Sequence, residues 1–243
     1  MRSVKEIQRV DRLNYKTQNN LKHLKVNLSQ IASALQFLHD ENKSPGVITH
    51  NDLKLQNILL DEDFIVKLTD FGGSTIIKDG KCIGDVQETP YIKPKERIEG
   101  KQLPSPSHDV FSYGVCLFIA MTGFKLGDYF YSYCEDRRHY LFEKITQIYQ
   151  GIRNDEILTK SGNKEKELQI LYHLFEVFQS CCFVNCDKRT TADSIFSTFQ
   201  NLIVSKSLAL MFVKTKNKQK SLQSTIKTFQ YSSEWIDIEQ VNN

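Results

Sequence analysis

The sequence predicts a mainly α-helical lobe, and three features of its 243 residues support that fold class. Apolar residues recur at helical spacing in residues 27–39 and again in residues 191–204. Residues 109–122 are apolar on nearly every side, as expected for a helix buried in the middle of a domain. The clearest strand patterns are the short runs 58–60 and 64–68, which an acidic turn joins into a hairpin.

The remaining elements follow along the chain. The helix at 109–122 should end at Gly123, because glycine favours the left-handed conformation that closes helices. Further helical patterns cover residues 140–149 and 167–179. Residues 155–166 are polar and interrupted by glycine, which predicts an exposed connection.

The segment that carries chemistry is His-Asn-Asp-Leu-Lys-Leu-Gln-Asn at residues 50–57, followed by Asp70-Phe71-Gly72. Asp52 can accept the proton of a substrate hydroxyl, and Lys54 can neutralise charge on a transferring phosphoryl group. Asn57 and Asp70 offer the hard oxygen ligands that Mg²⁺ prefers. The hairpin between Asn57 and Asp70 should bring both residues to the same end, so the pattern predicts phosphoryl transfer.

These motifs resemble those of the eukaryotic protein kinase family, and the Asp-Leu-Lys context is similar to its Ser/Thr class. Three further segments are similar to that family: residues 89–96, 107–115 and 185–191. The resemblance runs from about Leu28 to Ile203 and belongs to the large, helical C-terminal lobe. It implies ATP and Mg²⁺ as cofactors, proteins as substrates, and phosphoryl transfer to serine or threonine.

The resemblance also implies a role for each motif residue. Asp52 and Lys54 are the expected catalytic pair, while Thr89 should line the substrate groove and contact both. The expected cofactor-binding residues are Asn57, Leu59 and Asp70, with Asn57 and Asp70 also holding the metal. The structural residues of the motif are expected to be His50, Phe71, Gly72, Glu96, Asp109 and Arg189.

Among the structural residues, the resemblance implies that His50 packs beneath Phe71 and ties to Asp109. That structural role outweighs the acid–base role which a histidine beside Asp52 also suggests. Glu96 and Arg189 are the family's ion pair and should be buried or half-buried. Asp109 should accept hydrogen bonds from the backbone around His50.

Two motifs of the family's small lobe are missing from these residues. None of the 11 glycines forms Gly-x-Gly-x-x-Gly, and no Ala-x-Lys occurs. Residues 1–26 are therefore expected to be a remnant, a short helix or strap between lobes, and the N-terminal β-sheet is expected to be absent. The chain should then be a truncated catalytic lobe that leaves an apolar patch near Leu59 and Phe71. A missing N-lobe or a partner chain would cover that patch.

The domain organisation follows from this comparison. Residues 27–204 form the lobe, and residues 124–166 are longer than the family core needs, which indicates an insertion. Residues 205–243 are a polar tail. That tail is either solvated and mobile or docks on the lobe or a partner, with Trp235 as its anchor.

Two substitutions within the motifs bear on regulation. Asn51 stands where many kinases have an arginine that binds an activation-loop phosphate, and asparagine cannot make that charged contact. The later half of residues 73–88 has no hydroxyl side chain, so a phosphorylation switch there is not expected. Lys95 replaces a proline beside the expected substrate groove.

Composition narrows the class of protein further. The net charge of +3 argues for neither nucleic acid nor an anionic membrane surface. No apolar run is long enough to span a bilayer, and no signal peptide is visible. The six cysteines have no disulfide-framework spacing, so reduced thiols in a cytoplasmic protein are favoured over a zinc site at 181–186.

Two functions from different classes remain open. The first is a catalytic lobe of a Ser/Thr protein kinase. The second is a non-catalytic, pseudokinase-like module that keeps the lobe as a binding scaffold. Retention of all four chemical residues, Asp52, Lys54, Asn57 and Asp70, favours the kinase.

Overall fold

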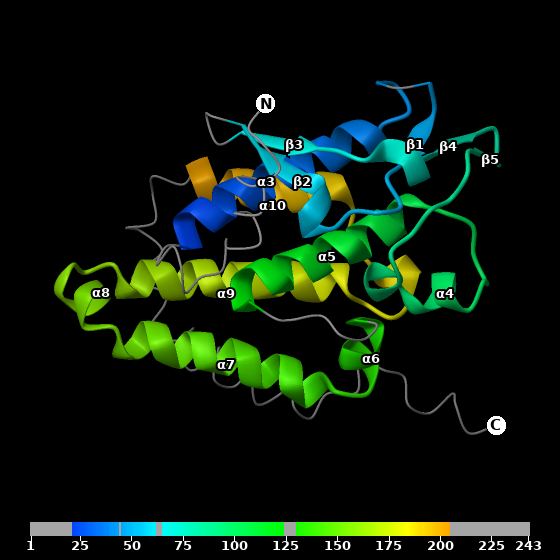
Figure 1. Ribbon diagram of the computed structural model, residues 1–243. Helices are drawn as coiled ribbons and strands as arrows, with labels where there is room; N and C mark the ends of the chain where they lie inside the picture. The colour runs from blue at the N-terminus through cyan, green and yellow to red at the C-terminus, as the bar shows by residue number, and fades with distance from the viewer. Residues whose placement is uncertain (1–20, 44, 62–64, 124–129, 205–243) are drawn as a thin grey trace.

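The computed structural model describes residues 21–43, 45–61, 65–123 and 130–204 (Figure 1). The predicted tail at 205–243, with Trp235, and residues 1–20 of the predicted remnant lie outside this part of the chain.

The described residues are mainly helical, which confirms the predicted fold class. The α-helices are α3 (Leu21–His39), α4 (Lys95–Ile98), α5 (Pro106–Thr122), α6 (Phe130–Glu135), α7 (Arg138–Asn154), α8 (Glu156–Lys160), α9 (Lys164–Cys181) and α10 (Ala192–Val204). The strands are β1 (Val47–Thr49), β2 (Ile58–Leu60), β3 (Val66–Leu68), β4 (Thr75–Lys78) and β5 (Lys81–Ile83). Short 3₁₀ turns lie at η2 (Leu55–Asn57), η3 (Phe71–Gly73), η4 (Pro90–Ile92) and η5 (Cys186–Lys188).

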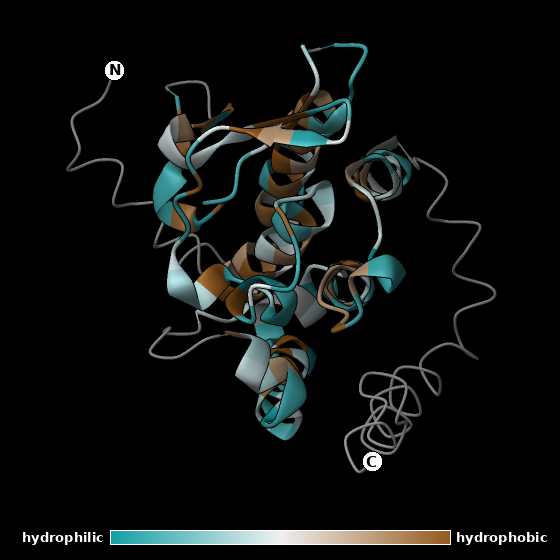
Figure 2. Ribbon diagram, turned by 90° about the vertical axis from the view of Figure 1, so that its right-hand side faces the viewer, coloured by the Kyte–Doolittle hydropathy of each residue, from teal (hydrophilic) through white to brown (hydrophobic). Residues whose placement is uncertain are grey.

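The helices stack in layers around α5. Figure 1 shows α3 and α10 side by side, with β2 and β3 next to them and β1, β4 and β5 to the right, α5 and α9 in the middle, and α7 beneath. In Figure 2 the hydrophobic stretches lie largely where helices face one another. Within the described part of the chain, every helix is too short or too polar to cross a lipid bilayer.

Helix α5 is the buried centre of the lobe. Thirteen of its residues are buried, and Gly123 ends it with a positive φ of 68°, as predicted. The helix begins at Pro106 rather than at Asp109, because Ser105 is the N-cap and proline suits the first helical position. A Cβ at Gly114 would lie 2.5 Å from Cys182 Sγ, so glycine permits the close approach of α9.

The helix before the 50–57 motif is longer than predicted. Helix α3 begins at Leu21, so the expected boundary between residues 26 and 27 falls inside it. Glu167 of α9 explains part of this extension, because its carboxylate accepts a hydrogen bond from the backbone N–H of Leu21 at 3.2 Å. That contact is between distant residues, and local periodicity could not indicate it.

The strands form two small antiparallel sheets. The predicted hairpin is β2–β3, in which Leu59 lies opposite Lys67. The other sheet has the order β1-β4-β5 and was not predicted. Asp79 and Gly80 both have positive φ, at 50° and 70°, and make the tight turn between β4 and β5. An Asp-Gly pair between strand-forming residues is a hairpin signal that could have been used.

The region between α7 and α9 is helical rather than irregular. Both flanking helices extend beyond the predicted 140–149 and 167–179, and α8 lies within the predicted connection at 155–166. The residues of that connection whose burial is described are largely exposed, which agrees with their polar composition. Gly162, with φ of 69°, makes the turn into α9.

The cysteines are free thiols and largely buried. Cys116, Cys134, Cys181 and Cys182 are all buried. Burial raises the pKa of Cys116 to about 12, and it also raises the pKa values of Cys181 and Cys182. These thiols therefore behave as small apolar side chains of the core.

His108 is a neutral histidine at the start of α5. It is 3% exposed, and its Nδ1 accepts a hydrogen bond from the backbone N–H of Ser105 at 3.0 Å. Burial is the largest cause that lowers its pKa, to about 4 from an ordinary 6.5, although nearby Glu96 acts in the opposite direction. Since Nδ1 is the acceptor, the proton of the neutral ring is on Nε2.

We expect the free energy of unfolding to fall by about 2 kcal/mol between pH 7 and pH 5 because of His108. In this interval the unfolded chain binds a proton at His108 and the folded chain does not, so stability is lost as pH falls. Urea unfolding at both pH values should show that His108→Gln reduces this loss. The same change at exposed His139 is the control, and an equal pH dependence in wild type and His108→Gln would contradict the assignment.

Candidate active site

The loop between β1 and β2 brings Asp52 and Lys54 together with Thr89. Lys54 Nζ lies 2.7 Å from Asp52 Oδ2 and 2.7 Å from Thr89 Oγ1. The backbone N–H of Thr89 donates to Asp52 Oδ1 at 3.0 Å. Each oxygen of the carboxylate is thus fixed by a different partner, which orients Asp52 toward the segment that contains Thr89.

The β2–β3 hairpin places Asn57 and Asp70 at one end of the loop, as predicted. Both the N–H and the hydroxyl of Thr69 donate to the carbonyl of Asn57, at 3.0 Å and 3.1 Å. Asn57 Nδ2 donates to the Asp52 carbonyl and to Asp52 Oδ2, at 2.9 Å and 3.1 Å. The amide oxygen of Asn57 is therefore the atom suited to bind a cation. Asp70 is exposed, and its φ of 64° is a left-handed conformation that costs free energy outside glycine.

His50 uses both ring nitrogens within the loop. Its Nδ1 lies 3.3 Å from the backbone nitrogen of Asp52, and its Nε2 lies 3.1 Å from the carbonyl oxygen of Thr69. The ring centroids of His50 and Phe71 are 4.8 Å apart. The ring is fully buried, so this geometry favours a structural role over proton exchange with substrate.

Asp109 anchors the loop to α5, as predicted. Its carboxylate accepts hydrogen bonds from the backbone N–H groups of His50 and Asn51, at 2.8 Å and 2.9 Å. His39 Nε2 is 3.0 Å from the same carboxylate. Burial acts to raise the pKa of Asp109, but His39 and the backbone donors outweigh burial and hold the pKa below its ordinary value.

Asn51 has a different task from the arginine of many kinases. Its φ is 65°, which asparagine tolerates better than most residues. Its side-chain amide donates to the Gly73 carbonyl at 2.8 Å and to Thr75 Oγ1 at 3.2 Å. Thr75 is buried and pairs with Thr49 Oγ1 at 2.7 Å. Asn51 therefore ties the start of the segment after Phe71 to the catalytic loop.

Glu96 and Arg189 form the predicted ion pair. Arg189 Nη1 and Nη2 lie 2.5 Å and 3.1 Å from the two carboxylate oxygens of Glu96. The two residues are 9% and 7% exposed. The guanidinium of Arg189 also lies over the ring of Phe111, with Cζ 5.0 Å from the ring centroid. Phe111 therefore contacts the flat face of the guanidinium, while Glu96 binds its N–H groups.

The remaining predicted site residues are Leu59, Phe71 and Gly72. Leu59 is half-buried on β2, whereas Phe71 is 45% exposed. The apolar patch expected near these two residues stays a prediction. A Cβ at Gly72 would lie 3.5 Å from Asp70 Oδ1, an ordinary contact.

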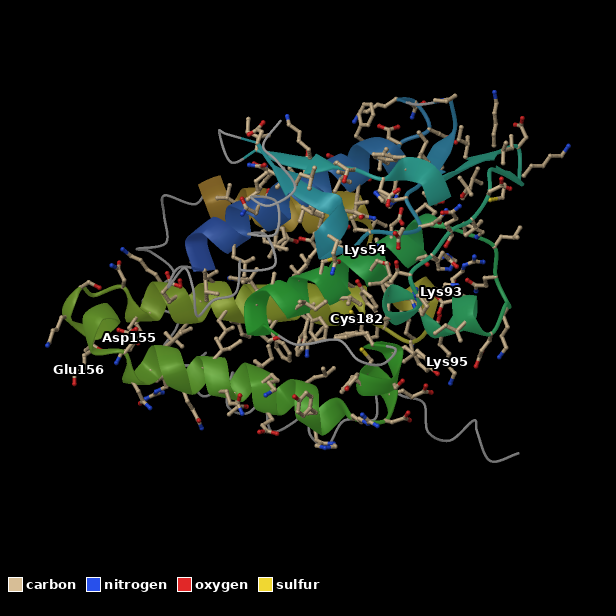
Figure 3. All side chains as sticks on the ribbon, viewed as in Figure 1. Lys54, Lys93, Lys95, Asp155, Glu156 and Cys182 are labelled. Atoms are coloured by element: carbon tan, nitrogen blue, oxygen red, sulfur yellow. The ribbon has the colours of Figure 1, made fainter. Side chains whose placement is uncertain are left out.

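Lys95 forms a contact that the family's proline could not make. Its Nζ lies 2.6 Å from Glu135 Oε1 of α6, and this hydrogen bond is the largest cause that raises the pKa of Lys95. Figure 3 shows Lys54, Lys93 and Lys95 on the side of the catalytic loop and α4. Asp155, the C-cap of α7, and Glu156, the first residue of α8, lie at the opposite end (Figure 3).

Two kinds of site residue were missed from the sequence. His39 contacts Asp109, and its place just before the loop, at the end of α3, is the signal that could have indicated it. Glu88 and Arg97 form a half-buried ion pair beside Thr89. No local pattern marks that pair, because it depends on how the chain returns after β5.

Together, the helical lobe, the fixed Asp52–Lys54–Thr89 group and the Asn57–Asp70 pair define a protein-kinase lobe. The family model described as "Protein kinase domain" matches residues 3–199, and the chain belongs to this family. The match begins well before Leu28, where the sequence resemblance was placed.

Relatives with protein kinase names, one of them a serine/threonine-protein kinase, match over a shorter segment. The chain is 36% identical over 94 residues to the protein kinase domain-containing protein ppk9 of Schizosaccharomyces pombe. It is 36% identical over 94 residues to the mouse serine/threonine-protein kinase SIK1 and 37% identical over 94 residues to the carbon catabolite-derepressing protein kinase of Candida tropicalis. Each match covers 39% of this chain and, in that order, 17%, 11% and 14% of the relative, so the chain matches less than a fifth of these proteins.

Proposed function

We propose that this lobe catalyses ATP-dependent phosphoryl transfer to serine or threonine of protein substrates. The observation that carries the proposal is the hydrogen-bonded group of Asp52, Lys54 and Thr89. A carboxylate held in this way can accept the proton of a substrate hydroxyl at Asp52. The ammonium of Lys54 stabilises negative charge that develops beside it.

The same proposal assigns the cofactor residues. Asn57 and Asp70 would hold Mg²⁺, because both present hard oxygen atoms at one end of the loop. When bound, Mg²⁺ neutralises phosphate charge on ATP. Leu59 would contact the nucleotide from β2. The shift of Asp70 into the left-handed region is consistent with a carboxylate held for binding rather than for packing.

We further propose that transfer needs a second lobe over the ATP phosphates. Two observations support this: the 243 residues have no Gly-x-Gly-x-x-Gly, and Phe71 is 45% exposed beside the site. Such a lobe would come from another part of a longer protein or from a partner chain. The free thiols suit a reducing, intracellular location.

The test is phosphoryl transfer from ATP to a mixture of protein substrates. The purified chain alone should be inactive or nearly so, because positioning of the nucleotide is part of the catalysis. Addition of a kinase small lobe, fused or in trans, should produce activity. Asp52→Ala should then lower the rate at least about a hundredfold, whereas the same change at exposed Asp136 should not.

Two outcomes would change the proposal. Strong Asp52-dependent transfer by the chain alone would show that the second lobe is not required. Absence of transfer with a small lobe that demonstrably binds would favour the non-catalytic scaffold.

A further inference from the structure

A half-buried ion-pair cluster lies directly beside Thr89. Glu88 Oε1 accepts from Arg97 Nε at 2.9 Å, and Oε2 accepts from Arg97 Nη2 at 3.1 Å. Lys93 Nζ is 3.0 Å from the same Oε2. The side chain of Glu88 is 6% exposed and that of Arg97 is 12% exposed. Burial acts to raise the pKa of Glu88, but Arg97 and Lys93 outweigh it and hold that pKa below its ordinary value.

This cluster connects the substrate segment to the helix that follows it. Arg97 lies on α4, and its Nη1 also donates to the carbonyl of Gln102. The side chain of Glu88 accepts hydrogen bonds from Arg97. The next residue is Thr89, whose backbone N–H donates to Asp52 Oδ1. Movement of Glu88 away from Arg97 would therefore pull Thr89 from the catalytic carboxylate.

The two ends of the segment 73–88 are held together as well. A Cβ at Gly73 would collide with the backbone of Gln87, so the chain returns against its own start. Gly73 is itself bonded to Asn51. The segment is thus held at its first residue, Gly73, by Asn51 and at its last residue, Glu88, by Arg97 and Lys93.

The segment 73–88 has few hydroxyl groups that could be phosphorylated to hold it in place. Residues 76–88 contain no serine, threonine or tyrosine. Thr75 is buried, and Ser74 Oγ donates to the His50 carbonyl at 3.2 Å. Asn51 has no charge to attract a phosphate, and its amide is used by Gly73 and Thr75.

We propose that Glu88 is a positioning residue which, held between Arg97 and Lys93, keeps Thr89 on Asp52 without phosphorylation of the segment. This inference rests on the proposed function for its meaning in catalysis. The effect of Glu88 on the position of Thr89 does not depend on catalysis. The positioning role and the proposed function can therefore be tested separately. Carboxylate–guanidinium contacts of this bidentate kind are directional enough to fix a loop.

The structural test is amide hydrogen exchange of the whole chain at residue resolution. Glu88→Gln should raise the exchange rate of the Thr89 amide about tenfold relative to wild type. Glu99→Gln is the matched control, because Glu99 pairs with Lys101 at the surface on the next turn. Arg97→Met should have the same effect as Glu88→Gln, and the double variant should add little.

Core amides of α5 report global stability in the same measurement. Equal increases at Thr89 and in α5 would mean general destabilisation and would overturn the inference, as would an unchanged Thr89 amide in Glu88→Gln. If the Thr89 amide responds but no form of the protein transfers phosphate, the cluster stands and the proposed function fails.

The catalytic test uses the chain with an added small lobe. Glu88→Gln should raise KM for the protein substrate about tenfold and leave KM for ATP unchanged, because the proposed function assigns Thr89 to the protein-substrate groove. Phosphatase treatment should leave the wild-type rate unchanged. A phosphatase-sensitive rate, or an equal rise in both KM values, would overturn the inference.

Discussion

Arg189→Met should lower the free energy of unfolding by about 3–5 kcal/mol, because it leaves the buried carboxylate of Glu96 without its partner. The loss extends beyond one ion pair. Arg189 also donates to the carbonyls of Phe183, Val184 and Ser107, at 2.8 Å, 3.3 Å and 3.2 Å. Urea unfolding of the purified chain measures the change.

Two variants separate the ion pair from packing. Lys101→Met at a surface pair should leave the free energy of unfolding nearly unchanged, since exposed pairs contribute little. The double variant of Glu96→Met and Arg189→Met should be destabilised less than the sum of its single changes, because no charge is left buried alone. A loss below about 1 kcal/mol in Arg189→Met would contradict the buried-pair assignment.

The parts of the fold that could be predicted are those with a local signal. Helix α5 follows from its long apolar run. The β2–β3 hairpin follows from two short apolar runs with an acidic turn between them. The contacts of Glu96 and Asp109 could be placed because their segments resemble a known family. The start of α3 at Leu21 and the β1-β4-β5 sheet were missed, and both involve partners far along the chain.

In the site, too, residues with a local signal could be predicted and contacts between distant residues could not. The residue types at Asp52, Lys54, Asn57 and Asp70 indicate their chemistry, and their spacing places them near one another. The sequence does not indicate that Glu88 faces Arg97, because that contact forms only when the chain returns after β5. Asn51 was recognised as a departure from an arginine, but its bond to the Gly73 carbonyl needed the structure.

Asp109 holds the loop that contains His50 and Asn51, because its carboxylate accepts hydrogen bonds from both backbone N–H groups. Asp109→Ala should lower the free energy of unfolding by about 3–5 kcal/mol, because it leaves two buried backbone donors and His39 without their acceptor. Asp109→Asn keeps the size of the side chain, but its NH₂ group cannot accept a hydrogen bond. It should therefore recover only part of the loss.

Amide exchange and pH distinguish this anchor from ordinary packing. In either variant the amides of His50 and Asn51 should exchange faster, while Asp193→Ala, at a surface contact with Gln36, should leave them unchanged. Because the pKa of Asp109 is lowered in the fold, its contribution is present above an ordinary pKa of 3.8 and is lost as pH falls through the folded value. Asp109→Asn has no such titration, so the difference between it and wild type should shrink in strong acid. A difference that stays constant through that range, with unchanged amides at His50 and Asn51, would show that Asp109 acts by filling space and not by holding the loop.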